Sequence, residues 1–192
     1  MKTPIFKGSG KILKTRVFRP DEIIEMRKHM SYEEKINFDM CLLLGGRYLE
    51  DVRIQNNPKW YDGEKFVHIT EHKAKRIAPN RAIRLSNRGI NTIEHFFNNG
   101  KKLPSVQHFD KKIKEWSNLA GLGTEGVSAR SLRKTWESWL FTYFPNHVTT
   151  ICSSQGHNEL TSFQSYTNTG FTDEDVSKMK EWIDGWEPKE RK

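Results

Sequence analysis

The sequence predicts a mainly α-helical α+β domain, with a small antiparallel β-sheet inserted after the second helix. Three observations predict this class. Apolar residues recur at helical spacing along most of the chain, capping residues precede several of these segments, and the period shortens to that of strands only in the middle. The length of 192 residues is enough for one such domain with a real core.

Two helices are expected in the first quarter of the chain. Residues 1–18 are rich in Lys, Gly and Thr, so we expect a basic arm there. The next stretch, RPDEIIEMRKHM, suits a helix because proline and aspartate stand in its first turn. A clearer helix follows in SYEEKINFDMCLLLGG, since Ser31 and Glu34 form a capping box and the glycine pair 45–46 ends it.

The middle of the chain is expected to form the sheet. The stretches KWYDGEKFVHIT and NRAIRLS predict short strands, and Asp62–Gly63 predicts a turn. Between them lies a basic connection, EHKAKRIAPN, in which Pro79–Asn80 marks a bend.

The rest of the chain is expected to be helical. We predict one domain over 19–170, followed by a C-terminal helix and tail over 171–192 that Thr172 and Asp175 cap. Before that helix, further helices are expected over 89–100, 105–122, 128–144, 147–154 and 160–166.

Composition limits the possible functions. Lys and Arg number 32 against 24 Asp and Glu, which gives a net charge of +8 and favours polyanionic partners such as nucleic acid. Cys41 and Cys152 stand alone, so they predict neither a disulfide framework nor a zinc site. With no signal peptide and no apolar run that could cross a bilayer, we expect a soluble cytoplasmic protein with no membrane partner.

Tyr166, near the end of the chain, is preceded by four groups of basic residues. Paired guanidinium groups can hold the non-bridging oxygens of a phosphodiester and offset the charge that grows in the transition state. A tyrosine hydroxyl could then attack phosphorus. A lysine could protonate the departing sugar oxygen, and a histidine could take the tyrosine proton or bond to the phosphate. The basic residues are, in order, Arg47, then Lys73, Lys75 and Arg76, then Arg130 and Arg133, and finally His157.

This order resembles the catalytic domain of the tyrosine recombinases (phage-type integrases), which runs arginine, sheet lysine, H-x-x-R, G-H and tyrosine. The stretch GGRYLE resembles the G-x-R-x-x-E box, and RSLRKTWESWL resembles H-x-L-R-x-T. The stretch QGHNELTSFQSYTN resembles the L-G-H box, including the nine-residue step from histidine to tyrosine. The resemblance runs from about residue 18 to the C-terminus and implies the integrase-like catalytic fold.

The resemblance also implies a role for each matching residue. Arg47 and Arg133 would be the phosphate clamp and Tyr166 the nucleophile. His157 matches the G-H histidine, and Lys73 matches the sheet lysine, with Lys75 as the alternative. The remaining predictions are Arg130 in the catalytic set and Lys75, Arg76 and Lys134 as DNA contacts. The family's reaction implies no cofactor and no metal.

Two features depart from the family pattern. Arg130 replaces the histidine of H-x-x-R, and a guanidinium cannot act as a base. Some archaeal and viral members vary this position too, so we expect loss of a proton shuttle rather than loss of activity, and an archaeal, viral or mobile-element origin. Too few residues precede Arg47 to build the helical core-binding domain that members usually carry.

The implied activity is site-specific DNA recombination on double-stranded DNA. Two rounds of transesterification through a 3′-phosphotyrosyl link would be performed by a homotetramer on two duplexes, in the cytoplasm or nucleoid of a host cell. Two alternatives stay open. One is a nicking-closing enzyme of the type IB topoisomerase kind, and the other is a DNA-binding relative that has lost the chemistry.

The last helix carries an apolar stripe that must be buried somewhere. Its own domain is one possible partner and a neighbouring protomer is the other. The resemblance implies exchange onto the neighbour, with TNTGF as the hinge. Deleting the residues after Gly170 would then spare the fold but weaken self-association on DNA and disturb cleavage. The stripe consists of Val176, Met179, Trp182, Ile183 and Trp186.

Overall fold

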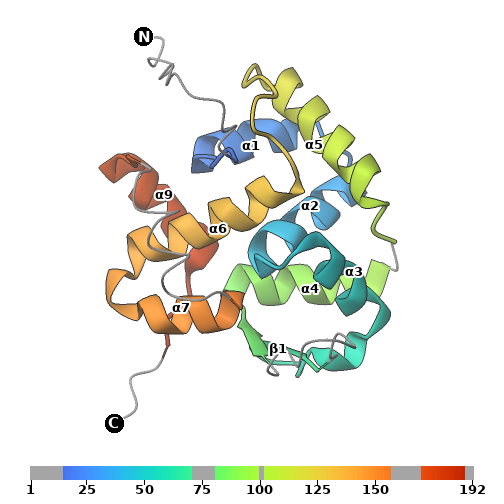
Figure 1. Cartoon of the computed structure of the whole chain (residues 1–192), viewed down its shortest axis with the longest axis vertical. Helices are drawn as coiled ribbons and strands as arrows, with labels where there is room; N and C mark the ends of the chain where they lie inside the picture. The colour runs from blue at the N-terminus through green and yellow to red at the C-terminus, as the bar shows by residue number, and fades with distance from the viewer. Residues whose placement is uncertain (1–14, 71–80, 100–101, 157–169, 189–192) are drawn as a thin grey trace.

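The computed structural model describes residues 15–70, 81–99, 102–156 and 170–188 (Figure 1). Two antiparallel strands, β1 (Phe66–Ile69) and β2 (Arg81–Arg84), pair within this part of the chain. The 3₁₀ turns are η1 (Pro58–Trp60) and η2 (Pro145–His147). The helices are α1 (Pro20–Lys28), α2 (Tyr32–Leu44), α3 (Tyr48–Asn56), α4 (Asn87–Asn99), α5 (Val106–Leu119), α6 (Ala129–Tyr143), α7 (Val148–Gln155) and α9 (Asp173–Ile183).

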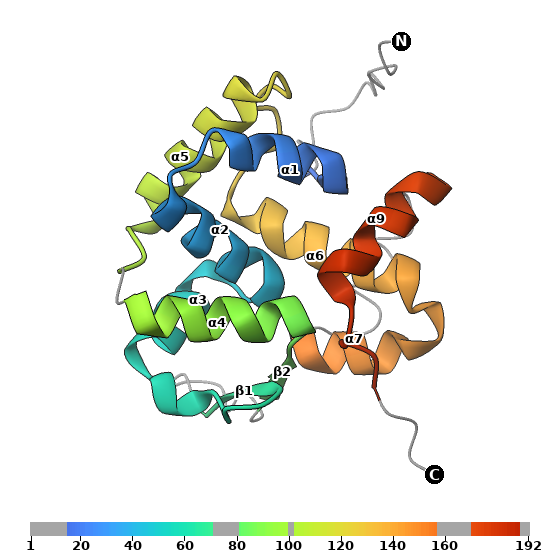
Figure 2. The same ribbon diagram turned by 180° about the vertical axis from the view of Figure 1, so that it is seen from behind.

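The predicted fold class is confirmed, and α2 and α6 lie at its centre. Helix α2 packs between α4 and α6, and α6 also contacts α5, α7 and α9. In both views α1 and α5 lie at one end of the molecule, and the sheet lies at the other end beside α3 and α4 (Figures 1 and 2). The sheet follows the third helix, because the short helix α3 stands between α2 and the strands.

Helix α2 begins and ends as the sequence predicts. The Ser31 hydroxyl accepts from the Glu34 N–H at 3.2 Å, and the Glu34 carboxylate accepts from the Ser31 N–H at 2.9 Å. The helix ends at Gly45, whose φ of +57° lies in the left-handed region. Every residue from Phe38 to Gly46 is buried, as expected for a helix that is apolar on most sides.

The two strands match the predicted hairpin, with a shorter first strand. Val67 pairs with Ile83, and both side chains are fully buried. Residues 58–60 form a 3₁₀ turn instead of the start of a strand, because Pro58 fixes its own φ and lacks an N–H for strand pairing. The Arg84 N–H donates to the Ser154 hydroxyl at 3.0 Å, so β2 is bound to α7.

Phe18 packs into the core of the domain. Phe18, which the sequence places in the basic arm, is fully buried. Its N–H donates to the Thr135 hydroxyl at 2.9 Å, and its carbonyl accepts from Trp139 Nε1 at 3.0 Å. Residues 1–14 of the arm and the predicted helix over 160–166 lie outside the described residues.

Helix α9 packs on its own domain, against α1, α4 and α6. The predicted capping pair is present, since the Thr172 hydroxyl accepts from the Asp175 N–H. Trp182 packs edge-on against Trp139, and Trp186 stacks on Phe144. Exchange of this helix between protomers stays a prediction. None of the helices described here is long and apolar enough to cross a membrane.

Candidate functional site

The first predicted clamp arginine, Arg47, lies between the end of α2 and the start of α3. Gly45 turns the chain, and Arg47 takes an extended conformation just before the first residue of α3. Both its N–H and its guanidinium donate to Glu50, at 2.8 Å and 2.9 Å. The side chain is 58% exposed, so Glu50 holds an accessible cation at the start of the helix.

The second predicted clamp arginine, Arg133, is buried in the first half of α6 and only 7% exposed. Its Nη1 donates to the Gly45 carbonyl at 2.8 Å, and its Nη2 donates to the Gln155 carbonyl at 2.5 Å. Gly45 ends α2 and Gln155 is the last residue of α7. Arg133 therefore joins two helix ends, where carbonyl groups lack partners within their own helix.

A third arginine, which the sequence analysis did not single out, completes the cluster. Arg81 is the first residue of β2, and its side chain is 11% exposed. Its Nη2 donates to Glu50 at 2.8 Å, and its Nη1 donates to the Gln155 carbonyl. One signal could have identified it. Arg81 stands two residues before the fully buried Ile83, so it lies on the buried face of the strand, where a charge needs a partner.

These contacts close into a ring. The Glu50 carboxylate accepts hydrogen bonds from both Arg47 and Arg81, and the Gln155 carbonyl accepts from both Arg81 and Arg133. Arg133 also donates to the carbonyl of Gly45, which lies two residues before Arg47 in the sequence. We call this set the arginine ring, and it consists of Gly45, Arg47, Glu50, Arg81, Arg133 and Gln155. The ring brings the two predicted clamp residues together at one place on the fold.

Glycine is required at Gly156, next to the ring. Gly156 has a φ of +64°, which favours glycine. A Cβ there would overlap Arg81 Nη1, so the guanidinium packs directly against the glycine backbone. A larger residue at the start of the G-H motif would therefore displace Arg81 from its present position.

Charge in the ring shifts the pKa values of two adjacent carboxyl groups in opposite directions. Burial alone would raise the pKa of Glu50, but Arg81 and Arg47 outweigh it and the pKa is lowered. The pKa of Asp51 is raised well above its usual value, first by complete burial and then by Glu50. Arg133 and Arg81 oppose that rise without reversing it. Glu50 is therefore the charged partner of the arginines, and Asp51 favours its neutral form.

The other predicted site residues divide into two groups. Arg130 is exposed in the first turn of α6, and Lys134 is half-buried one turn later. Five predicted residues lie outside the described ranges, and they are Lys73, Lys75, Arg76, His157 and Tyr166. The described structure therefore brings Arg47 and Arg133 together and adds Arg81.

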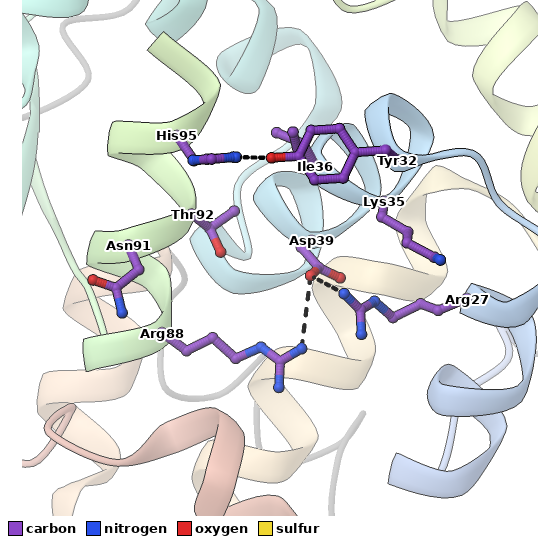
Figure 3. Close-up of a pocket in the computed structure, with 9 residues that line it drawn as sticks. All are labelled: Arg27, Tyr32, Lys35, Ile36, Asp39, Arg88, Asn91, Thr92 and His95. Atoms are coloured by element: carbon purple, nitrogen blue, oxygen red, sulfur yellow. Dashed lines mark hydrogen bonds and ion pairs between the residues drawn. The ribbon is translucent and has the colours of Figure 1, made fainter. Parts of the chain in front are cut away.

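A cavity of about 280 Å³ lies between α1, α2 and α4, and it shares no residue with the ring (Figure 3). Its centre is the buried carboxylate of Asp39, which pairs with Arg27 at 2.9 Å and Arg88 at 3.7 Å. The Arg88 guanidinium lies 3.5 Å from the centre of the Trp182 ring. These contacts connect α1, α2 and α4 to α9, so the charged residues of this cavity have a packing role.

Comparison with known proteins supports the fold. No protein-family model and no curated sequence relative matches the chain. Among solved structures, the chain is similar to the XerH site-specific recombinase bound to palindromic difH substrate in a post-cleavage complex. The TM-score is 0.62 and the identity 18%, over 92% of this chain and 54% of that chain.

It is also similar to the XerA recombinase, with a TM-score of 0.55 and 15% identity over 86% of this chain and 64% of that chain. The chain thus spans about half the length of XerH and somewhat less than two thirds of XerA. The likeness extends over most of the chain and shows the tyrosine recombinase catalytic-domain fold.

Proposed function

We propose that this chain is the catalytic domain of a site-specific tyrosine recombinase that cuts and rejoins DNA through a 3′-phosphotyrosyl intermediate. The observation that carries the proposal is the arginine ring. Two arginines that the sequence resemblance assigns to a phosphate clamp, 86 residues apart in the chain, belong to one hydrogen-bonded ring in a fold similar to that of XerH.

In this proposal the arginine ring forms a positively charged binding site for one phosphodiester. Arg47 is exposed and held by Glu50, so it can bind a non-bridging oxygen without leaving its carboxylate partner. Arg133 adds a buried positive charge to the same place. Donors that are already oriented stabilise the growing negative charge with little rearrangement.

The chemical step is a transesterification. The Tyr166 oxygen forms a bond to phosphorus, and the bond from phosphorus to the 5′ sugar oxygen breaks. His157 would accept the tyrosine proton, and Lys73, with Lys75 as the alternative, would supply the proton that the leaving 5′-hydroxyl needs. A 5′-hydroxyl from a second strand reverses these steps and releases the tyrosine, so bond energy is conserved.

Double-stranded DNA is the proposed partner, and a homotetramer on two sites is the proposed assembly. The XerH recombinase in the similar structure is bound to its difH substrate. The net charge of +8 suits a polyanion, and the exposed Arg130 and half-buried Lys134 would lie near the bound phosphates. Origin in a virus or mobile element stays a prediction from the sequence.

The test is covalent capture. The chain is incubated with a pool of nicked duplexes whose sequence is randomised around the nick, and a denaturing gel then separates protein–DNA adducts. We expect an adduct with the native chain and none with Tyr166→Phe, which lacks only the attacking hydroxyl. Tyr143→Phe, a matched change on α6, should still form the adduct.

A second candidate function is DNA binding without catalysis. Arg130 supplies no base at its position, and both terminal nitrogens of Arg133 are bound to main-chain carbonyls. DNA binding with no adduct from any duplex in the pool would favour this candidate. Relaxation of supercoiled plasmid with no preference for sequence would instead favour a nicking-closing enzyme of the type IB topoisomerase kind.

A further inference from the structure

We infer that Arg81 is a positioning residue for the proposed cleavage reaction, holding the two clamp arginines and the Gln155–Gly156 turn in one fixed arrangement. The inference rests on the proposed function and adds a residue to it. Arg81 belongs to none of the boxes on which the sequence resemblance depends.

The contacts of Arg81 connect it to both predicted clamp arginines. Through Glu50 it acts on Arg47, because one carboxylate oxygen accepts both from Arg81 Nη2 and from the Arg47 N–H, each at 2.8 Å. Through the Gln155 carbonyl it acts on Arg133, which donates to the same oxygen. Among the printed contacts of the ring, Arg81 is the side chain that joins Glu50 to the Gln155 carbonyl, whereas Arg133 joins that carbonyl to Gly45.

Arg81 also packs against the backbone at the end of α7. Its guanidinium occupies the space that a Cβ of Gly156 would need, so it supports the residue directly before His157. Its own main chain follows the segment that carries Lys73 and Lys75. A displacement of about 1 Å in such a support can slow catalysis about 100-fold even where no reacting atom is touched.

Arg81 is a less suitable phosphate ligand than Arg47. Its side chain is 11% exposed against 58% for Arg47, and both of its terminal nitrogens already donate within the protein. A DNA phosphate could reach Arg81 only after these hydrogen bonds break, and the same holds for Arg133, whose terminal nitrogens also donate within the protein. The contribution of Arg81 is therefore to the placement of neighbouring groups, and the salt dependence of DNA binding should not depend on it.

The electrostatics of Glu50 provide a readout that a purely structural role would not change. Arg81 and Arg47 lower the pKa of Glu50, and the ionisable groups of Asp51 on α3 and Arg133 on α6 also lie around this pair. Removing Arg81 should let Glu50 take up a proton at a higher pH. Arg47 would then lose its charged partner at that higher pH.

The experiment compares Arg81→Met with Arg84→Met on a duplex that the native chain cleaves. Both variants lose one cation from β2, but Arg84 lies over the Phe66 ring and takes no part in the arginine ring. We expect Arg81→Met to slow adduct formation about 10- to 100-fold. The acidic limb of the pH–rate profile of Arg81→Met should move to higher pH, while the dependence of its DNA affinity on salt should stay unchanged. Arg84→Met should keep the native rate and the native pH–rate profile.

Arg81→Lys is a second variant that keeps a cation but cannot reach both acceptors as a planar fork does. We expect an intermediate rate with a native acidic limb, and this variant carries the test if Arg81→Met does not fold. If the Arg81 variants cleave with the same rates and pH profiles as Arg84→Met, the inference is overturned while the proposed function stays intact. If the native chain forms no adduct, the proposed function itself fails and the inference falls with it.

Discussion

Arg81 and Arg133 donate to one and the same oxygen, the main-chain carbonyl of Gln155. Each guanidinium also binds a second acceptor, Glu50 for Arg81 and the Gly45 carbonyl for Arg133. Burial lowers the pKa of Arg81, and the charge of Arg133 adds to that effect. A substitution at either arginine should therefore affect the other, although they lie on different elements.

Arg133→Ala should reduce both stability and cleavage. The change leaves the Gly45 and Gln155 carbonyls without this donor, so we expect a loss of about 1–3 kcal/mol in the free energy of unfolding. Cleavage should fall by roughly two to three orders of magnitude through lost charge stabilisation. Urea unfolding and single-turnover cleavage measure the two effects. Arg130→Ala is the control for stability, since a change at this exposed residue should alter the free energy of unfolding by less than about 0.5 kcal/mol. Equal losses in the free energy of unfolding for both variants would contradict the effect expected from their difference in burial.

Gly156→Ala should be more destabilising than Gly121→Ala. Both glycines have positive φ, +64° and +72°, but a Cβ meets nothing within 4 Å at Gly121 and meets Arg81 Nη1 at Gly156. The backbone conformation alone should contribute about 1–2 kcal/mol at either position. Chemical unfolding should show an additional loss at Gly156, and that excess should disappear when Arg81 is also changed to Ala. An excess that persists in the double variant would mean that another group causes the clash.

Asp51→Asn should change how stability depends on pH. The folded-state pKa of Asp51 is raised, so between the ordinary pKa of an aspartate and that raised value the folded protein holds a proton that the unfolded chain has released. Stability therefore falls as pH rises through this window, and Asn, which cannot ionise, should remove that fall. Urea unfolding at several pH values should show that the free energy of unfolding of the variant rises relative to that of the native protein as pH rises. A constant difference would show that the Asp51 pKa is close to its usual value.

Trp182→Ala should strongly destabilise the domain. The side chain is 1% exposed and packs against Trp139 and Arg88, so we expect a loss of about 3–5 kcal/mol. Lys180→Ala, an exposed change on the same helix, should have little effect. Deleting residues 171–192, which the sequence resemblance implies would spare the fold, should instead destabilise the domain even more, because Met179, Ile183 and Trp186 leave the core with it. Thermal unfolding followed by tryptophan fluorescence measures these changes, and a truncated chain with native stability would argue that α9 belongs on a neighbouring protomer.

Much of the fold could be predicted because its signals are local. The Ser31 and Thr172 caps and the left-handed Gly45 depend on residues within one turn of each other. The start of the domain was harder to predict. Phe18 follows a run of polar and basic residues, and only tertiary packing against α6 shows that it belongs to the core.

The site could be predicted only in part, for the same reason. Arg47 and Arg133 stand in stretches that resemble family boxes. Arg81 binds Glu50 and Gln155, which lie 31 and 74 residues away, so no local pattern indicates either contact. Helical spacing also places Arg130 and Arg133 on one side of α6 but does not distinguish the exposed residue from the buried one.

The close approach of Arg81 to Gly156 has an evolutionary consequence. In homologous chains these two positions should not vary independently, although they lie 75 residues apart in sequence. Wherever a long guanidinium fills the space, only glycine fits opposite it. Where a smaller residue takes the place of Arg81, asparagine, which also tolerates positive φ, becomes acceptable at position 156. Such paired changes would mark lineages in which some other side chain joins Glu50 to the Gln155 carbonyl.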